Sequence, residues 1–217
     1  MGVRDGEALP IEPTAEDLDP TEFIDSDSEA VRAFVARVTD GGDDRDVVRR
    51  LFAAVRDGIR YDPYNVSGDP GDYRASAVLQ SDNGWCVQKS IALTAAARAA
   101  GIPSRLGFAD VRNHLQSERL RAVMGTDLFV WHGYSAFFVG GRWTKASCAF
   151  NAELCARFGV PALDFDGTSD ALLHRFSGDG SRYMEYVHDR GLYADLPFEE
   201  IMAGLREAYA RVVKDGE

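Results

Sequence analysis

The residue best placed for chemistry is Cys86, which stands where the sequence predicts the first turn of a helix. Residues 80–84 are turn-prone, whereas residues 91–100 are rich in strong helix formers and lead to Gly101 and Pro103, a common helix ending. A thiol in the first turn faces unpaired backbone N–H groups and the positive end of the helix dipole, and both favour the thiolate. Cys86 is therefore a candidate nucleophile. The alternative is a small buried apolar side chain, the commonest role of a free cysteine.

His132 is the candidate partner of this thiol. It lies in an aromatic and β-branched run that predicts a strand over residues 127–139, and Gly140 and Gly141 give a hairpin signal before a second strand over 142–146. A histidine fixed on a strand can accept the thiol proton, hold the ion pair and later protonate the leaving group. The alternative is a core or edge histidine whose ring is satisfied by the backbone.

Four landmarks follow one another along the chain: Gly84-Trp85-Cys86 opening a helix, Gly101-Ile102-Pro103-Ser104-Arg105 closing it, Trp131-His132-Gly133-Tyr134 on a strand, and Trp143 after the hairpin. In this order they resemble the transglutaminase-like superfamily in its bacterial branch, over a stretch from about Tyr61 to Asn151. The resemblance implies an α+β, papain-like core in which N-terminal helices, the nucleophile helix among them, pack on an antiparallel sheet. It also implies acyl-transfer chemistry of the Cys-His-Asp type.

The third position of this triad departs from the family pattern. Counted from Trp143, the family's aspartate falls on Ser147. A serine hydroxyl can accept a hydrogen bond from the imidazole and fix its tautomer, but it supplies no negative charge. Asn151 is the alternative, since an amide fills this role in papain-like proteases. Asp164 and Asp166 are later candidates.

Three further residues are candidates for supporting roles. Gln80 precedes Cys86 by six positions, the distance at which papain-like proteases place an oxyanion-hole glutamine, so its amide is a candidate donor to an oxyanion. The alternative is a plain loop glutamine. Trp85 and Trp131 flank the Cys-His pair and are candidates for the pocket walls, with ordinary core aromatics as the alternative.

Composition limits the compartment and the partners. A chain of 217 residues that is 45% hydrophobic suits a domain with a sizeable core, and its net charge of −11 disfavours nucleic acid or an anionic membrane as partner. The first residues lack the pattern of a secretory leader, and no apolar run is long enough to span a membrane. An odd number of cysteines, three, then indicates a reducing cytoplasm rather than a disulfide framework.

No metal or cofactor is expected. Cys148 and Cys155 have no close histidine or cysteine at zinc spacing. Residues 164–170 mimic a calcium loop, but the glycine comes too early and Arg175 stands where a bidentate glutamate belongs. A turn with a helix cap fits that segment better.

The hydrophobic pattern predicts an extended acidic arm over residues 1–23 and a single domain over residues 24–217. Within that domain Ser26 and Ser28 are candidate caps of a first helix, the polar stretch 113–126 is a candidate mobile flap, and Pro197 opens a last amphipathic helix.

These observations support three hypotheses. The first is cysteine-dependent acyl transfer on an amide or ester, with hydrolysis of a peptide, protein or small amide favoured over crosslinking because water is the default acceptor. The second is a non-catalytic module that keeps the fold as a binding or scaffolding surface, for which the serine at position 147 is the best support. The third is arylamine N-acetyl transfer, which needs a coenzyme A site, and no phosphate-cradling pattern is visible. The sequence does not define the substrate or the oligomeric state.

Overall fold

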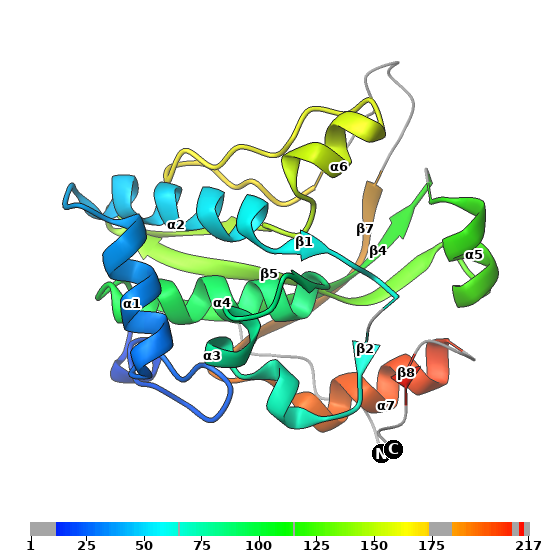
Figure 1. Cartoon of the computed structure of the whole chain (residues 1–217), viewed down its shortest axis with the longest axis horizontal. Coiled ribbons are helices and arrows are strands. Elements are labelled where there is room, and N and C mark those ends of the chain that lie inside the picture. The colour runs from blue at the N-terminus through cyan, green and yellow to red at the C-terminus, as the bar shows by residue number, and fades with distance from the viewer. Residues whose placement is uncertain (1–11, 65, 115, 174–183, 210–212, 215–217) are drawn as a thin grey trace.

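A four-stranded antiparallel sheet, in the order β6-β5-β4-β7, and the helix that it curls around form the centre of the molecule (Figure 1). The computed structural model describes residues 12–64, 66–114, 116–173, 184–209 and 213–214. In chain order the helices are η1 (Ala15–Asp17), α1 (Glu29–Val38), α2 (Asp44–Gly58), η2 (Pro70–Tyr73), α3 (Ala75–Val78), α4 (Cys86–Ala99), α5 (Glu118–Met124), α6 (Ala152–Arg157) and α7 (Phe198–Ala208). The strands are β1 (Arg60–Tyr61), β2 (Val66–Ser67), β3 (Asn83–Gly84), β4 (Ser104–Asn113), β5 (Leu128–Val139), β6 (Arg142–Ala146), β7 (Met184–Tyr193) and β8 (Val213–Lys214).

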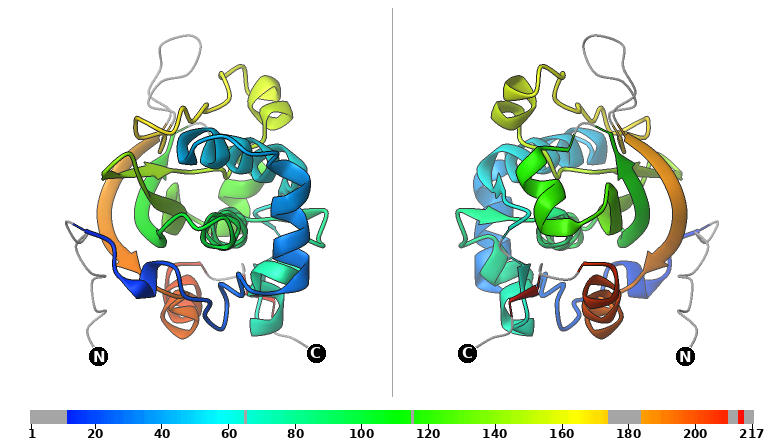
Figure 2. Two further views of the ribbon diagram at one scale, coloured as in Figure 1. Left: turned by 90° about the vertical axis from the view of Figure 1, so that its left-hand side faces the viewer. Right: turned by 90° about the vertical axis from the view of Figure 1, so that its right-hand side faces the viewer.

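Helix α4 is the central element. Viewed nearly along its axis, the sheet curves around one side of it, while α1 and α2 lie on other sides (Figure 2). Every residue from Cys86 to Arg98 is buried, because the alanine-rich sequence lets β5, α1, α2 and α3 approach the helix on several faces. The helix expected after Cys86 is therefore present, and it is a core helix rather than an amphipathic surface helix.

A buried lysine ties α4 to α2. The Nζ of Lys89 donates hydrogen bonds to the carbonyl oxygens of Arg56, at 2.9 Å, and Ile59, at 2.6 Å, at the C-terminal end of α2. An ammonium group suits that end of a helix, where carbonyl groups lack partners within the helix. Burial still lowers the pKa of Lys89 to about 8. The contact fixes the first turns of α4 in the core.

The short parallel pair of β1 and β3 brings a distant loop to the start of α4. Tyr61 lies opposite Gly84, two residues before Cys86, and the backbone N–H of Asp62 donates to the carbonyl of Gly84 at 3.1 Å. The segment 61–64 is thereby held beside the cysteine.

The N-terminal segment is anchored to the core at two points. Most of residues 12–22 are exposed, but Asp17 is fully buried and forms an ion pair with buried Arg105, and Phe23 is also buried. A charge taken out of water requires such a partner, which lies 88 positions away in the sequence. Residues 1–11 lie outside the described residues.

Most other elements follow the sequence patterns. Ser28 caps α1 by accepting from the N–H of Val31, and α7 begins after Pro197 and buries one apolar face. The candidate flap instead contains α5, which Ser117 caps and Gly125 ends in the left-handed conformation. Among the described residues, no helix combines the length and the apolar character needed to cross a bilayer.

Candidate active site

Cys86 is the first residue of α4, as the sequence predicts, and it is 4% exposed. The preceding turn is fixed by Gln88, whose side-chain oxygen accepts from the backbone N–H of Trp85 at 3.3 Å. The backbone N–H groups of Gly133, Val87 and Cys86 itself are near the sulfur and act to lower the pKa of the thiol. The thiol therefore lies at a helix N-terminus surrounded by backbone donors.

His132 lies at the same cavity as Cys86 because β5 packs directly on the first turn of α4. The contact passes over Gly133, where an added Cβ would lie only 3.0 Å from the Cα of Val87 and 3.1 Å from the carbonyl oxygen of Cys86. Any other residue would press on this backbone, so glycine favours the close approach. Cys86 and His132 then line one small cavity of about 30 Å³, together with Tyr61, Pro63, Val66, Trp85, Met124, Phe129, Val130, Leu205 and Tyr209; we call it the Cys86 cavity.

Ser147 lies on the far side of the imidazole. Its Oγ is 3.2 Å from Nε2 of His132, and both side chains are buried. The backbone N–H of Ser147 donates to the carbonyl of Ala171 at 2.9 Å, which fixes the residue just after β6. If Nε2 carries the proton of the neutral ring, Nδ1 is left as the acceptor.

A β-bulge lies immediately before His132. Ala109 pairs with His132 and Val111 with Phe129, so two residues of β5, Val130 and Trp131, face a single residue of β4. Trp131 has φ +58°, a left-handed conformation that is costly for a bulky side chain. The bulge sets the direction in which His132 leaves the strand.

At the bulge, two backbone N–H groups of β5 lose their partners on the neighbouring strand, and side chains accept their hydrogen bonds instead. Asp110 accepts from the N–H of Trp131 at 3.1 Å, and the hydroxyl of Tyr209 accepts from the N–H of Val130 at 2.6 Å. Arg190 of β7 binds both carboxylate oxygens of Asp110, at 2.6 and 2.8 Å, and its guanidinium carbon lies 4.4 Å from the centre of the Trp131 ring. This bidentate pair, the bulge clamp, holds the strained segment in place.

Burial dominates the charges of the Cys-His pair. It raises the pKa of Cys86 to about 11, and the backbone N–H groups of Gly133, Val87 and Cys86 offset it only in part. Burial also lowers the pKa of His132 to about 4. At neutral pH the resting pair is thus a thiol and a neutral imidazole. This differs from the thiolate that the helix N-terminus favours, because the loss of hydration outweighs the helix dipole.

The structure leaves several sequence candidates away from the pair. The Asn151 side-chain oxygen accepts from the backbone N–H of Tyr61 at 3.3 Å, and no hydrogen bond among the described residues joins it to His132. Gln80 is exposed and donates to the carbonyl of Ser76, so it does not line the Cys86 cavity. Asp164 and Asp166 are also exposed.

Of the two tryptophans, one lines the cavity and the other is a core residue. Trp85 lines the Cys86 cavity as a wall. Trp131, although adjacent to His132, is a core residue: its ring packs against Phe108 and Tyr193, at 5.6 and 6.2 Å between ring centres. Because the backbone at Trp131 is left-handed, the Trp131 side chain points into the core while the next side chain, His132, points into the Cys86 cavity.

Sequence reasoning missed Asp110, Arg190 and the role of Tyr209. None of them belongs to a motif, and each contacts β5 from 21 or more positions away. The sequence carried one faint signal, a charged Asp110 within the apolar strand pattern that follows α4. Within the described residues, no group of three or more His, Cys, Asp or Glu side chains is arranged to hold a metal ion.

The comparison with protein families identifies the class. Residues 32–148 match the core model of the transglutaminase-like superfamily, and this range contains Cys86, His132 and Ser147. The match covers more than half of the chain, so the protein belongs to the transglutaminase-like superfamily. The α+β, papain-like fold expected from the sequence is confirmed by this match and by the curled antiparallel sheet.

Two solved structures resemble parts of the chain. A "putative cysteine protease" from Cytophaga hutchinsonii is 15% identical with a TM-score of 0.47, and the match covers 62% of this chain and 41% of that one. A "putative protease" from Parabacteroides distasonis ATCC 8503 is 19% identical with a TM-score of 0.37, covering 53% of this chain and 22% of that one. The matched regions thus make up less than half of either relative. The chain matches no curated protein.

The bulge clamp yields a prediction on stability. Asp110→Ala should lower the free energy of unfolding in urea by about 3 kcal/mol, because it leaves the guanidinium of Arg190 largely buried without its partner. Asp127→Ala is the matched control, since the ion pair of Asp127 with Arg112 is 36–40% exposed and should contribute less than about 1 kcal/mol. Equal losses in the two variants would show that the clamp does not support the bulge.

Proposed function

We propose that this protein is a cysteine-dependent acyl-transfer enzyme that hydrolyses an amide or peptide bond, with Cys86 as nucleophile and His132 as general base and acid. The observation that carries the proposal is the shared cavity: a thiol at a helix N-terminus and a strand histidine line the same space. Membership of the transglutaminase-like superfamily, a cysteine-based catalytic fold, supports it independently.

The proposed first step transfers a proton and forms a bond. With Nε2–H directed at the oxygen of Ser147, Nδ1 accepts the proton of the Cys86 thiol, and the sulfur attacks the substrate carbonyl carbon. The first-turn N–H groups of α4 are the nearest donors for the resulting oxyanion. His132 then returns the proton to the leaving amine as the carbon–nitrogen bond breaks, and a thioester remains on Cys86.

The second step regenerates the thiol. His132 takes a proton from water, the hydroxide attacks the thioester, and the carbon–sulfur bond breaks to release the acid product while the sulfur regains the proton. Water is proposed as the acceptor because no dedicated amine site is recognisable. A peptide, protein or small amide remains the proposed substrate class, and the three free cysteines support a reducing compartment, the cytoplasm.

The neutral resting pair fits this mechanism. Transfer of a proton from a thiol with a raised pKa creates an ion pair only as the substrate binds, and a thiolate of high pKa is intrinsically the stronger nucleophile. The cost is that Ser147, unlike an aspartate, supplies no charge to stabilise the imidazolium.

A non-catalytic binding module is the second candidate. The observation that favours it is the same serine, together with a Cys-His pair that burial keeps uncharged at neutral pH. The two candidates differ in whether His132 activates the thiol. No observation favours arylamine N-acetyl transfer over these two.

Alkylation of the three cysteines separates enzyme from module. We expect iodoacetamide to modify Cys86 faster than Cys148 and Cys155 at pH 7, and His132→Ala to slow that reaction on the order of 10²-fold because the proton acceptor is lost. Peptide mass spectrometry after short exposures gives the three rates. Cys155, buried in α6, is the internal control for folding, since its rate should not change in the variant. A Cys86 rate that His132→Ala leaves unchanged would favour the module.

The pH dependence tests the role of Ser147. Only neutral imidazole accepts a proton, so the Cys86 alkylation rate should fall as the pH drops through about 4, the pKa of His132. Ser147→Asp places a carboxylate beside Nε2 and stabilises the imidazolium. The pH at which the alkylation rate falls, which we call the acid limb, should therefore rise by at least about one pH unit. Ser147→Ala, which adds no charge, is the control and should leave the limb low. If Ser147→Asp left the limb unmoved, the side chain at position 147 would not contact His132.

A further inference from the structure

A larger cleft adjoins the Cys86 cavity. It has a volume of about 370 Å³, within the usual range of small-molecule sites, whereas the Cys86 cavity is much smaller, at about 30 Å³. Tyr61, Pro63 and Phe129 line both spaces, so the two lie next to each other. A substrate whose carbonyl reaches Cys86 therefore has this cleft as its adjacent binding space.

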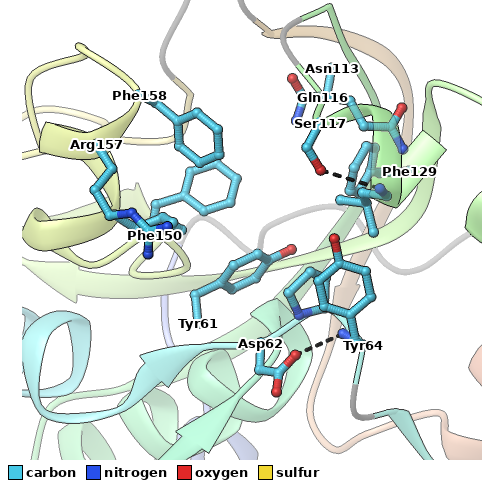
Figure 3. Close-up of a pocket in the computed structure, with 13 residues that line it drawn as sticks. Tyr61, Asp62, Tyr64, Asn113, Gln116, Ser117, Phe129, Phe150, Arg157 and Phe158 are labelled. Carbon is cyan, nitrogen blue, oxygen red and sulfur yellow. Dashed lines mark hydrogen bonds between the residues drawn. The ribbon is translucent and has the colours of Figure 1, made fainter. Parts of the chain in front are cut away.

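The walls of this cleft are largely aromatic. In Figure 3 Phe150 and Phe158 lie on one side, Tyr61 and Tyr64 lie lower in the opening, and Phe129 lies on the opposite side. Tyr61 and Phe150 meet edge to face, with ring centres 4.9 Å apart and planes at 87°. This packing gives the cleft a preformed aromatic surface, and we call it the aromatic cleft.

The rim of the aromatic cleft is incompletely covered. Phe158 is 43% exposed, although it lies next to other aromatic rings rather than alone on a polar surface. An exposed apolar ring next to a concave apolar wall marks a binding surface. A ligand ring bound there would remove the exposed ring and the wall from water. The second wall comes from the region of α5, on the far side of the opening.

The charged side chains in the lining of the cleft balance in sign. One acidic and one basic side chain, Asp62 and Arg157, line the cleft, so neither sign predominates. The carboxylate of Asp62 also accepts from the backbone N–H of Tyr64 at 2.9 Å, which fixes the turn at the cleft floor. The remaining lining is apolar or uncharged.

We propose that the aromatic cleft binds an uncharged aromatic side chain of the substrate, adjacent to the carbonyl that Cys86 attacks. The inference rests on the proposed function, since it takes the Cys86 cavity as the reaction site. It adds the substrate class: peptides or amides with a phenylalanine-like group beside the scissile bond.

Binding of small amides tests the cleft without requiring the reaction. The probes are N-acetyl-L-phenylalaninamide and N-acetyl-L-alaninamide, titrated by calorimetry or NMR into the full chain carrying Cys86→Ser. The phenylalanine amide should bind at least tenfold more tightly than the alanine amide. Phe158→Ala should weaken its binding at least fivefold, and Phe150→Leu provides a second variant that keeps an apolar side chain. Leu18→Ala is the matched control, because Leu18 is similarly exposed at 39% and lies outside the cleft lining.

Each outcome bears on one of the two proposals. Equal binding of the two amides, or binding that both cleft variants leave unchanged, would overturn the aromatic cleft. Selective binding combined with a Cys86 thiol that no electrophile labels would leave the cleft standing and reject the proposed acyl transfer. A reactive Cys86 in a protein that binds the two amides equally would support the proposed acyl transfer and reject the aromatic cleft.

Discussion

The rest of the structure depends on the burial of α4 along almost its whole length. The sheet, α1, α2 and α3 pack around this helix, and Lys89 fastens it to the end of α2. Because the helix is buried from its first residue, its N-terminal thiol is also removed from water. Burial then decides the charge state of Cys86 and His132, and it makes the pair neutral at rest although a helix N-terminus favours the thiolate.

The second constraint is the direction of His132. The β5 backbone passes so close to α4 that glycine is favoured at position 133. The bulge before it turns Trp131 into the core and His132 into the Cys86 cavity. Such a bulge leaves two N–H groups without ladder partners. Asp110 and Tyr209 accept from them, so strain at the site is compensated by contacts from β4 and from the end of α7.

Local patterns were sufficient to predict much of the fold and the Cys-His pair. The helix opened by Cys86 and the strand carrying His132 are coded by neighbouring residues, and the hairpin after it places Ser147 on the same side. The contacts that neighbouring residues do not encode are long-range: Asp17 pairs with Arg105, 88 positions away, and this pair anchors the N-terminal segment. Gln80 is a candidate that the structure places away from the Cys86 cavity. Its spacing from Cys86 matches papain-like proteases, but spacing alone does not determine the direction in which a loop turns.

Formation of an acyl-enzyme is the most direct test of the account. The wild-type protein, mixed with the p-nitrophenyl ester of N-acetyl-L-phenylalanine, should release a rapid burst of about one equivalent of p-nitrophenol. Intact and peptide mass spectrometry should then find the acyl group on Cys86. Cys86→Ser serves as the control and should show neither the burst nor the adduct. A wild-type protein without a burst, or an acyl group carried equally by Cys148 or Cys155, would contradict the assignment of Cys86 as the nucleophile.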